Sequence, residues 1–180
     1  MINEKCKMVN VVAVLHNIRS LHNVGSIFRT ADGAGISKLY LTGYTCYPPR
    51  DEITKTALGA DKVVSWERHG HIGKLLDWLK AQGYHVAAVD NKCRDIRTKC
   101  YCKFQTKNSV AFIFGNEVKG LSGSILKKAD TILEIPMRGK KESLNVSVAF
   151  GIIAYQFTSK TANVPTKSRT CRGNGKYLSR

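Results

Sequence analysis

Short apolar runs alternate along the chain with stretches whose apolar residues return every three or four positions. The runs are rich in β-branched residues and predict buried strands, which we place at 9–15, 38–42, 62–66, 85–89, 109–114 and 131–135. The helical spacing predicts helices, with Ser122 capping the fourth, at 24–34, 51–58, 72–82, 122–128 and 146–157. Residues 91–108 show no clear period and many charges, which indicates a loop with at most one short strand. This alternation predicts an α/β fold, a mostly parallel sheet with helices on both faces.

The charge of the chain points to a polyanionic partner. Lys and Arg total 29 against 13 Asp and Glu, a formal net charge of +16. Such an excess attracts nucleic acid or an anionic membrane. We expect RNA and no membrane, because the sequence has no Lys/Arg-rich amphipathic helix and no lipidation motif. The first ten residues lack the apolar core of a signal peptide and no apolar run reaches membrane-spanning length, which predicts a cytoplasmic protein.

The length of the chain, 180 residues, indicates a single domain with a proper hydrophobic core. We expect this domain to cover 1–159. The remaining segment, 160–180, carries only basic charges and is rich in Thr, Ser, Gly and Asn. We expect it to be a flexible tail, either an arm that grips RNA or a solvated end without a role.

The cysteines give no metal-binding pattern. A cytoplasmic location predicts that all six are reduced thiols. Cys93, Cys100 and Cys102 cluster, but their spacing is not that of a zinc ribbon or finger and no histidine lies near them. We therefore expect no metal.

Three polar loops follow predicted strands, and parallel strands end at the same edge of a sheet. The third loop begins at Pro136, carries Arg138, Gly139, Lys140 and Lys141, and leads to an apolar helix that Ser143 or Asn145 opens. Free backbone N–H groups beside positive charge suit a phosphate or carboxylate ligand. The plain alternative is an ordinary strand–loop–helix connection in which Ser143 and Asn145 only cap the helix.

The three loops resemble the three signature motifs of the SpoU (TrmH-like) branch of the SPOUT RNA methyltransferases, in the same order and at fitting spacing. The matching stretches are NVGSIFRTA from Asn23, FGNEVKGL from Phe114, and IPMRG with SLNVSVA between Ile135 and Ala149. The resemblance covers 11–157. It implies a trefoil knot near the carboxyl end, S-adenosylmethionine as cofactor, and a homodimer that completes each active site.

The resemblance also implies which residues form the site. The cofactor would be bound by Gly115, Asn116, Gly120, Ile135, Met137, Leu144 and Asn145. Glycines at 115, 120 and 139 would let the backbone approach a ligand closely.

The implied reaction moves a methyl group from a sulfonium to a ribose 2′-hydroxyl. The catalytic role falls on Arg29, with Asn23 orienting and Glu117, Ser143 and Asn145 supporting. Because the pKa of arginine exceeds about 12, we expect Arg29 mainly to bind the neighbouring phosphate and stabilise the developing alkoxide. Alternatives remain for single residues: Arg29 could pair with Asp32 on the helix surface, and Glu117 could be a plain loop acid.

Substrate RNA would be bound by basic side chains, because only about ten residues precede the first strand and offer no separate RNA-binding domain. We expect phosphate contacts from Arg19, Arg29, Arg50, Lys55, Arg97 and Arg138. Tyr101 or Phe104 could stack on a base. His16 and His22, which lie in the turn that leads into the first motif, could act as bases in principle but are interpreted as turn or RNA-contact residues. Each basic residue could equally be plain solubility charge.

The sequence therefore predicts an S-adenosylmethionine-dependent RNA 2′-O-ribose methyltransferase, with tRNA favoured over ribosomal RNA. Two alternatives stay open: a SPOUT enzyme that methylates a base nitrogen, and a non-catalytic RNA-binding protein of the same fold. A dinucleotide dehydrogenase is disfavoured, because no strand is followed by the glycine spacing that binds pyrophosphate.

Overall fold

Seven parallel strands form the centre of this computed structural model, which describes residues 9–93 and 95–161. The strands are β1 (Val11–His16), β2 (Lys38–Thr42), β3 (Trp66–His69), β4 (His85–Val89), β5 (Thr98–Cys100), β6 (Val110–Phe114) and β7 (Thr131–Glu134). They lie in the order β3-β2-β1-β6-β4-β7-β5, and every neighbouring pair is parallel. The predicted fold class is confirmed.

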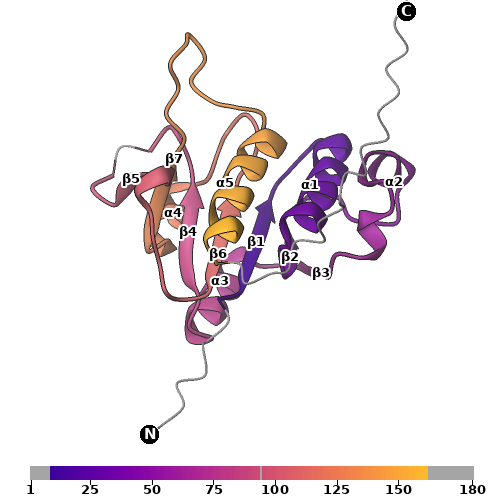
Figure 1. Ribbon diagram of the computed structural model, residues 1–180, viewed down its shortest axis with the longest axis horizontal. Helices are drawn as coiled ribbons and strands as arrows, with labels where there is room; N and C mark the ends of the chain where they lie inside the picture. The colour runs from indigo at the N-terminus through magenta and orange to yellow at the C-terminus, as the bar shows by residue number, and fades with distance from the viewer. Residues whose placement is uncertain (1–8, 94, 162–180) are drawn as a thin grey trace, which may run out of the picture.

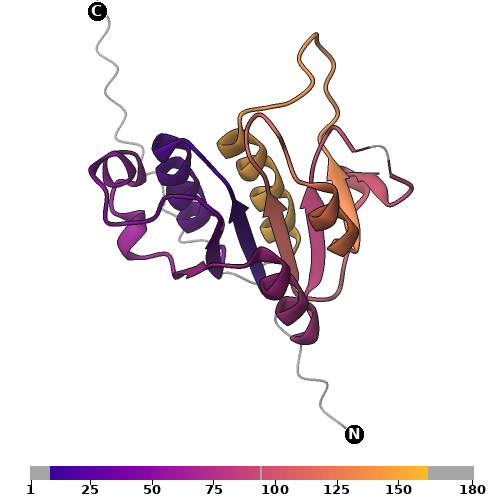
Figure 2. The same ribbon diagram turned by 180° about the vertical axis from the view of Figure 1, so that it is seen from behind.

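Helices cover both faces of the sheet, as Figures 1 and 2 show from opposite sides. They are α1 (Leu21–Ala34), α2 (Asp51–Ala57), α3 (Ile72–Ala81), α4 (Gly123–Lys128) and α5 (Val146–Thr161), with short 3-10 turns η1 (Ala60–Lys62) and η2 (Tyr101–Lys103). Successive side chains of a strand point to opposite faces. Ala13 and Leu15 of β1 therefore bury against α1, α2 and α5, whereas Val12 and Val14 bury against α3 and α4.

Two expectations about single elements are corrected. The strand predicted at 62–66 is wrong: the chain turns through η1, where the amide of Val64 donates to the carbonyl of Ala60, and β3 begins only at Trp66. Two adjacent valines in this turn gave a misleading strand signal. Ser122 precedes α4, but its hydroxyl makes no capping bond and contacts Ser124 instead. The segment 91–108 holds one short strand, β5, as the sequence allowed, followed by the turn η2.

The last helix is longer than the predicted helix at 146–157. Helix α5 runs to Thr161, so a domain limit at 159 falls inside this helix. Most of the predicted tail, 162–180, lies outside the described residues, as does Arg94. The knot stays a prediction. Within the described part of the chain, no helix combines the length and the hydrophobicity that crossing a bilayer requires.

Candidate functional site

The loops that follow β1, β6 and β7 meet at the carboxyl edge of the sheet. Strand β1 pairs with β6, and β4 lies between β6 and β7, so these loops leave a group of neighbouring strands. In open α/β sheets, ligands bind outside the carboxyl ends of the strands. The convergence of the three loops, expected from the sequence, is confirmed by direct hydrogen bonds among them.

One side chain from each loop contributes to a continuous chain of hydrogen bonds. The Nδ2 of Asn145 donates to the Oδ1 of Asn23 at 3.1 Å. The Nδ2 of Asn23 donates in turn to the Oε1 of Glu117 at 3.0 Å. Asn23 lies in the first turn of α1, and Asn145 stands directly before α5. The three residues named from the sequence as one group therefore lie together within a single chain, while their catalytic role stays a prediction.

Asn145 also starts helix α5. Its Oδ1 accepts hydrogen bonds from the backbone N of Ser147 at 2.8 Å and from the Oγ of Ser147 at 2.7 Å. An acceptor two residues before a helical amide is the usual N-cap arrangement. Of the two candidates for opening the helix, Asn145 is therefore the cap.

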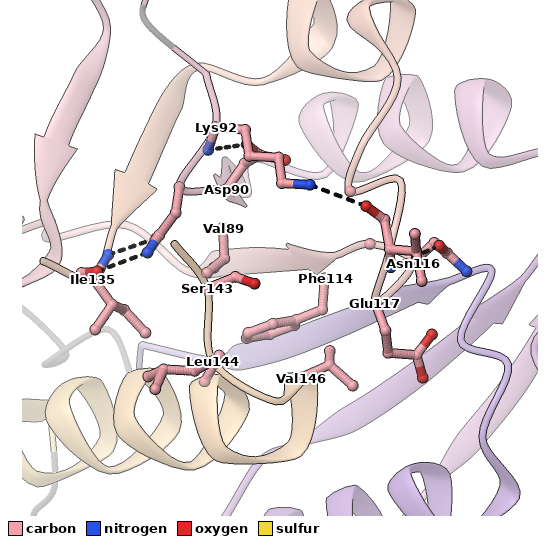
Figure 3. Close-up of a pocket in the computed structure, with 15 residues that line it drawn as sticks. Val89, Asp90, Lys92, Phe114, Asn116, Glu117, Ile135, Ser143, Leu144 and Val146 are labelled. Atoms are coloured by element: carbon pink, nitrogen blue, oxygen red, sulfur yellow. Dashed lines mark hydrogen bonds between the residues drawn. The ribbon is translucent and has the colours of Figure 1, made fainter. Parts of the chain in front are cut away.

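A pocket opens beside this hydrogen-bond chain, with about 620 Å³ of space when its open mouth is included (Figure 3). Phe114, Leu144 and Val146 give it an apolar wall. Among the residues predicted to bind the cofactor, those that line the pocket are Gly115, Asn116, Gly120, Ile135 and Leu144, whereas Met137 and Asn145 do not. Glu117 and Ser143, predicted to support catalysis, also line it. The described residues contain no cluster of three or more His, Cys, Asp or Glu side chains suited to a metal ion.

The surroundings of Glu117 favour its charged form. Burial alone raises the pKa of this carboxyl. Hydrogen bonds from Asn23 and from the backbone amides of Glu117 itself, Arg19 and Ser20 outweigh burial and lower the pKa below its ordinary value. Glu117 is thus a negative charge at the pocket, and a weak base for taking up a proton near neutral pH.

Asn116 uses its side chain to shape its own loop. Its Oδ1 accepts from the backbone N of Val118 and Lys119, and its Nδ2 donates to the carbonyl of Asn17 and to the hydroxyl of Tyr44. Both N–H groups of the amide are occupied. Asn116 therefore offers the pocket its backbone rather than a free side-chain donor.

Two glycines of the site are required by the backbone of their own loop. A Cβ on Gly115 would lie 2.7 Å from the carbonyl carbon and oxygen of Gly120, so the close neighbour is the loop's own backbone. Gly120 has φ +67°, a left-handed conformation that favours glycine. A Cβ on Gly139 would meet nothing within 4 Å. Gly115 and Gly120 thus have a reason within the loop itself, and the argument from close ligand approach stays a prediction for all three glycines.

The carboxyl end of β4 is a wall of the pocket that the sequence analysis missed. Val89, Asp90, Asn91 and Lys92 line it, and Figure 3 labels Val89, Asp90 and Lys92 at this wall. The signal that could have found them is their position, since polar residues directly after a parallel strand face the ligand edge.

Arg29 does not join the group formed by Asn23. The two residues are six positions apart on α1, a rotation of about 240° around the helix axis. Among the described residues, Arg29 has no hydrogen bond or ion pair, and its side chain is exposed. The alternative that it pairs with Asp32 is therefore not observed.

Two residues predicted to bind RNA are engaged elsewhere. Arg97 forms an ion pair with Asp95 at 2.7 Å and donates to the carbonyl of Ala129 at 2.6 Å. Phe104 is 4% exposed in the core, so the expectation that it could stack on a base is wrong; Tyr101 is half-buried. The other predicted contacts are exposed, namely Arg19, Arg50, Lys55 and Arg138.

His16 belongs to the turn after β1. Its ring lies between the hydroxyl of Thr42 at 2.9 Å and the Nδ2 of Asn17 at 3.0 Å. Burial lowers its pKa, which favours the neutral ring. Because both ring nitrogens have partners within the turn, the turn interpretation fits His16. His22 is exposed on α1.

Residues 10–155 match the family model of the SpoU rRNA Methylase family. The chain belongs to this family. A Staphylococcus aureus protein whose name places it in the TrmH family of tRNA/rRNA methyltransferases is 31% identical over 157 residues, which are 87% of this chain and 61% of the relative. The chain thus spans about three fifths of the length of that SpoU-type relative.

Solved structures have the same fold. The AdoMet-bound rRNA methyltransferase of Sinorhizobium meliloti superimposes with a TM-score of 0.75 at 28% identity, over 82% of this chain and 55% of that one. A structure from work on the 2-OH methylation of C/U34 on tRNA gives a TM-score of 0.72 at 25% identity, over 82% of this chain and 93% of that one. The SpoU family assignment, reached from three short motifs in the sequence, is therefore confirmed.

Proposed function

We propose that this SpoU-family chain is an S-adenosylmethionine-dependent RNA methyltransferase that modifies a ribose 2′-hydroxyl. The observation that carries the proposal is the hydrogen-bond chain from Asn145 through Asn23 to Glu117 beside an open pocket. These residues come from the three segments that resemble the SpoU motifs. The parts of the sequence that mark the family are thus the parts that meet at the pocket.

The pocket fits S-adenosylmethionine in size and chemistry. About 620 Å³, open mouth included, is within the range of small-molecule sites. Phe114 and Leu144 offer apolar surface to a purine, and the ionised Glu117 offers a negative charge to a sulfonium. The backbone of Gly115 and Ile135 would hold the adenosine part, as the resemblance implies. When bound, the cofactor supplies an electrophilic methyl group.

The protein must also help the acceptor hydroxyl lose its proton. Glu117 is poorly suited to take this proton, because its pKa is lowered and its oxygens already accept hydrogen bonds. Arg29 carries a guanidinium, a group that donates hydrogen bonds and is a poor base. Its proposed role is to bind the phosphate next to the target ribose and to stabilise the developing alkoxide, with the proton leaving late or to water.

A homodimer would bring Arg29 to a complete site. On α5, Val148 and Tyr155 are 50% and 52% exposed, and this helix is apolar on nearly all sides. A helix that is apolar all round is normally covered. Tyr155 lies against α1, because a Cβ on Gly33 would be 2.8 Å from its hydroxyl. The exposed surface next to Arg29 is therefore suited to a second copy, whose pocket Arg29 would complete.

RNA is the proposed substrate because the net charge of +16 favours a polyanion. We favour tRNA over ribosomal RNA. The match spans 93% of the structure from work on tRNA 2-OH methylation and 55% of the Sinorhizobium meliloti rRNA methyltransferase, so the former is the fuller comparison. The cytoplasmic location stays a prediction from the sequence.

The deciding experiment incubates the protein with methyl-labelled S-adenosylmethionine and separate pools of unmodified tRNA and ribosomal RNA, followed by alkaline hydrolysis. A methylated 2′-oxygen blocks cleavage of the next linkage, so the expected product is a labelled, alkali-resistant dinucleotide from the tRNA pool. Label released in mononucleotides would instead show methylation of a base. No label, together with no S-adenosylhomocysteine binding in calorimetry, would leave a non-catalytic RNA-binding protein.

The role of Arg29 is tested by Arg29→Lys, which keeps the charge and loses the planar, two-pronged guanidinium. We expect turnover at saturating RNA to fall by about a hundredfold, the scale of losing one oxyanion-stabilising donor. Arg68→Lys, the same change on the edge strand β3, is the matched control and should retain wild-type turnover. Near-wild-type turnover of Arg29→Lys would contradict the need for bidentate binding.

A further inference from the structure

The loop 136–141 rises above the sheet between β7 and α5 in Figure 1. The two residues that flank it, Ile135 and Glu142, lie close together and are called its neck below. The loop leaves the sheet at Ile135 and returns at Glu142. Both ends are bound by one side chain, that of Asn91 at the end of β4. The Oδ1 of Asn91 accepts from the Ile135 amide at 2.9 Å, and its Nδ2 donates to the carbonyls of Ile135 at 2.7 Å and Glu142 at 3.4 Å.

The side-chain amide of Asn91 makes the hydrogen bonds that a peptide group of β4 would make with β7. Strands β4 and β7 pair Val89 with Leu133, and the same register carried two residues further would pair position 91 with 135. The backbone of β4 cannot continue this ladder, because the amide of Lys92 turns back to the Oδ1 of Asp90 at 2.8 Å. The side-chain amide of Asn91 has one N–H side and one C=O side, as a peptide group has, so it supplies both hydrogen bonds that the ladder lacks.

The amide of Asn91 has no donor left for a ligand. Both of its N–H groups are used by the two carbonyls, and its oxygen is used by the Ile135 amide. Asn91 nevertheless lines the pocket, as do Ile135 at one end of the neck and Ser143 and Leu144 just beyond the other end. The dashed lines beside Ile135 in Figure 3 mark its two hydrogen bonds with this amide.

We propose that Asn91 is a positioning residue that fastens the neck of loop 136–141 and thereby fixes the pocket wall formed by Ile135, Ser143 and Leu144. No other side chain among the described residues bonds the backbone at both ends of this loop. The identity of the pocket's ligand, S-adenosylmethionine, rests on the proposed function. The inference that Asn91 holds the two ends of the loop together does not rest on the proposed function.

The test compares two variants that lose different numbers of hydrogen bonds. Asn91→Asp keeps the acceptor for the Ile135 amide and loses both donors, while Asn91→Leu is similar in size and loses all three hydrogen bonds. Asn108→Asp and Asn108→Leu are matched controls, because Asn108 is exposed and its side chain has no hydrogen bond among the described residues. The readouts are amide hydrogen exchange, S-adenosylhomocysteine binding by calorimetry, and steady-state kinetics.

Hydrogen exchange tests the fastening without any ligand. We expect the amides of 135–144 to exchange about tenfold faster in Asn91→Leu, the equivalent of one lost hydrogen bond, and by less in Asn91→Asp. The amides of β1 and β6 should keep wild-type rates. Unchanged exchange at 135–144, or an equal acceleration in β1 and β6, would overturn the proposal.

Binding and kinetics test the effect on the pocket. We expect the Kd of S-adenosylhomocysteine and the KM of S-adenosylmethionine to rise about tenfold in Asn91→Leu, with kcat within about twofold at saturation. A variant that merely folded poorly would lose kcat at constant KM. Kd and KM equal to those of wild type would therefore refute the positioning role. If the wild-type protein binds no S-adenosylhomocysteine, the proposed function fails, and hydrogen exchange alone decides on Asn91.

Discussion

Replacing Asn23 with aspartate should place two like charges against each other at the centre of the site. The Nδ2 of Asn23 donates to Glu117 at 3.0 Å, and Asn23→Asp removes this donor. At that separation two carboxylates repel by about 1.4–2.8 kcal/mol for an effective dielectric constant of about 40–80, a conservative choice above the value of about 20 that is typical of pairs near a protein surface. The lost hydrogen bond to a charged group adds about 1.5 kcal/mol. We expect the free energy of unfolding to fall by about 3–4 kcal/mol at about pH 7.5.

The same variant should recover much of this loss as the pH falls. Mutual repulsion raises the pKa of the carboxylate pair in the folded state, so a proton bound near pH 5 stabilises the folded state and restores one hydrogen bond between the two groups. In wild type the lowered pKa of Glu117 contributes stability above the ordinary value of 4.5, and this contribution is lost only as the pH falls below that value. The contribution of Glu117 to the stability of the wild-type protein is therefore nearly constant between about pH 5 and about pH 7.5.

Urea denaturation at both pH values measures the effect. Asn108→Asp introduces the same charge at an exposed position and is the matched control, with an expected change below about 0.5 kcal/mol at either pH. A loss in Asn23→Asp that is the same at both pH values would show that repulsion with Glu117 is not its cause. The hydrogen bond between Asn23 and Glu117 would then not be what holds the loops of the site together.

Three further outcomes follow from the geometry. Asn145→Ala removes the α5 cap and should lower the free energy of unfolding by about 1–2 kcal/mol in urea denaturation. Its control is Ser122→Ala, at a position without a capping bond, which should change the free energy of unfolding by less than about 0.5 kcal/mol. Gly115→Ala forces a Cβ into backbone at 2.7 Å and should weaken S-adenosylhomocysteine binding at least tenfold by calorimetry, while Gly139→Ala, with nothing within 4 Å, should leave it within about threefold. Arg138→Ala should lower by about one the slope of log K against log salt concentration for RNA binding, and an unchanged slope would exclude a phosphate contact.

The sequence predicted the elements and the meeting of the loops because both follow from local patterns. Buried strands such as β6 are nearly continuous apolar runs, and their parallel arrangement follows from the helices between them. Once the strands are parallel, their carboxyl ends must share an edge. The strand expected at 62–66 failed for the opposite reason, since two valines carry a strand signal that the turn at Gly59, with φ +90°, overrides.

The role of Asn91 was beyond local patterns, because it depends on which strand lies beside β4. That neighbour is β7, whose Ile135 is 44 residues further along the chain, and no periodicity states this pairing. Gly115 illustrates the same limit at short range. A Cβ at this position would lie closest to the backbone of Gly120, brought back by the bridge between Asn116 and Gly120, and this contact gives glycine a reason that the sequence did not reveal.

The direction of the hydrogen-bond chain explains why asparagine, rather than another polar residue, stands at two of its three positions. Glu117 is ionised and can only accept, so Asn23 must turn its N–H side toward it and its carbonyl toward Asn145. Asn145 must then donate to Asn23, which leaves its own oxygen for the first amides of α5. Asn23 and Asn145 therefore each need a donor and an acceptor on one short side chain. Aspartate lacks the donor and serine has only one atom for both tasks, so the charge at Glu117 determines the side chain required as far away as the start of α5.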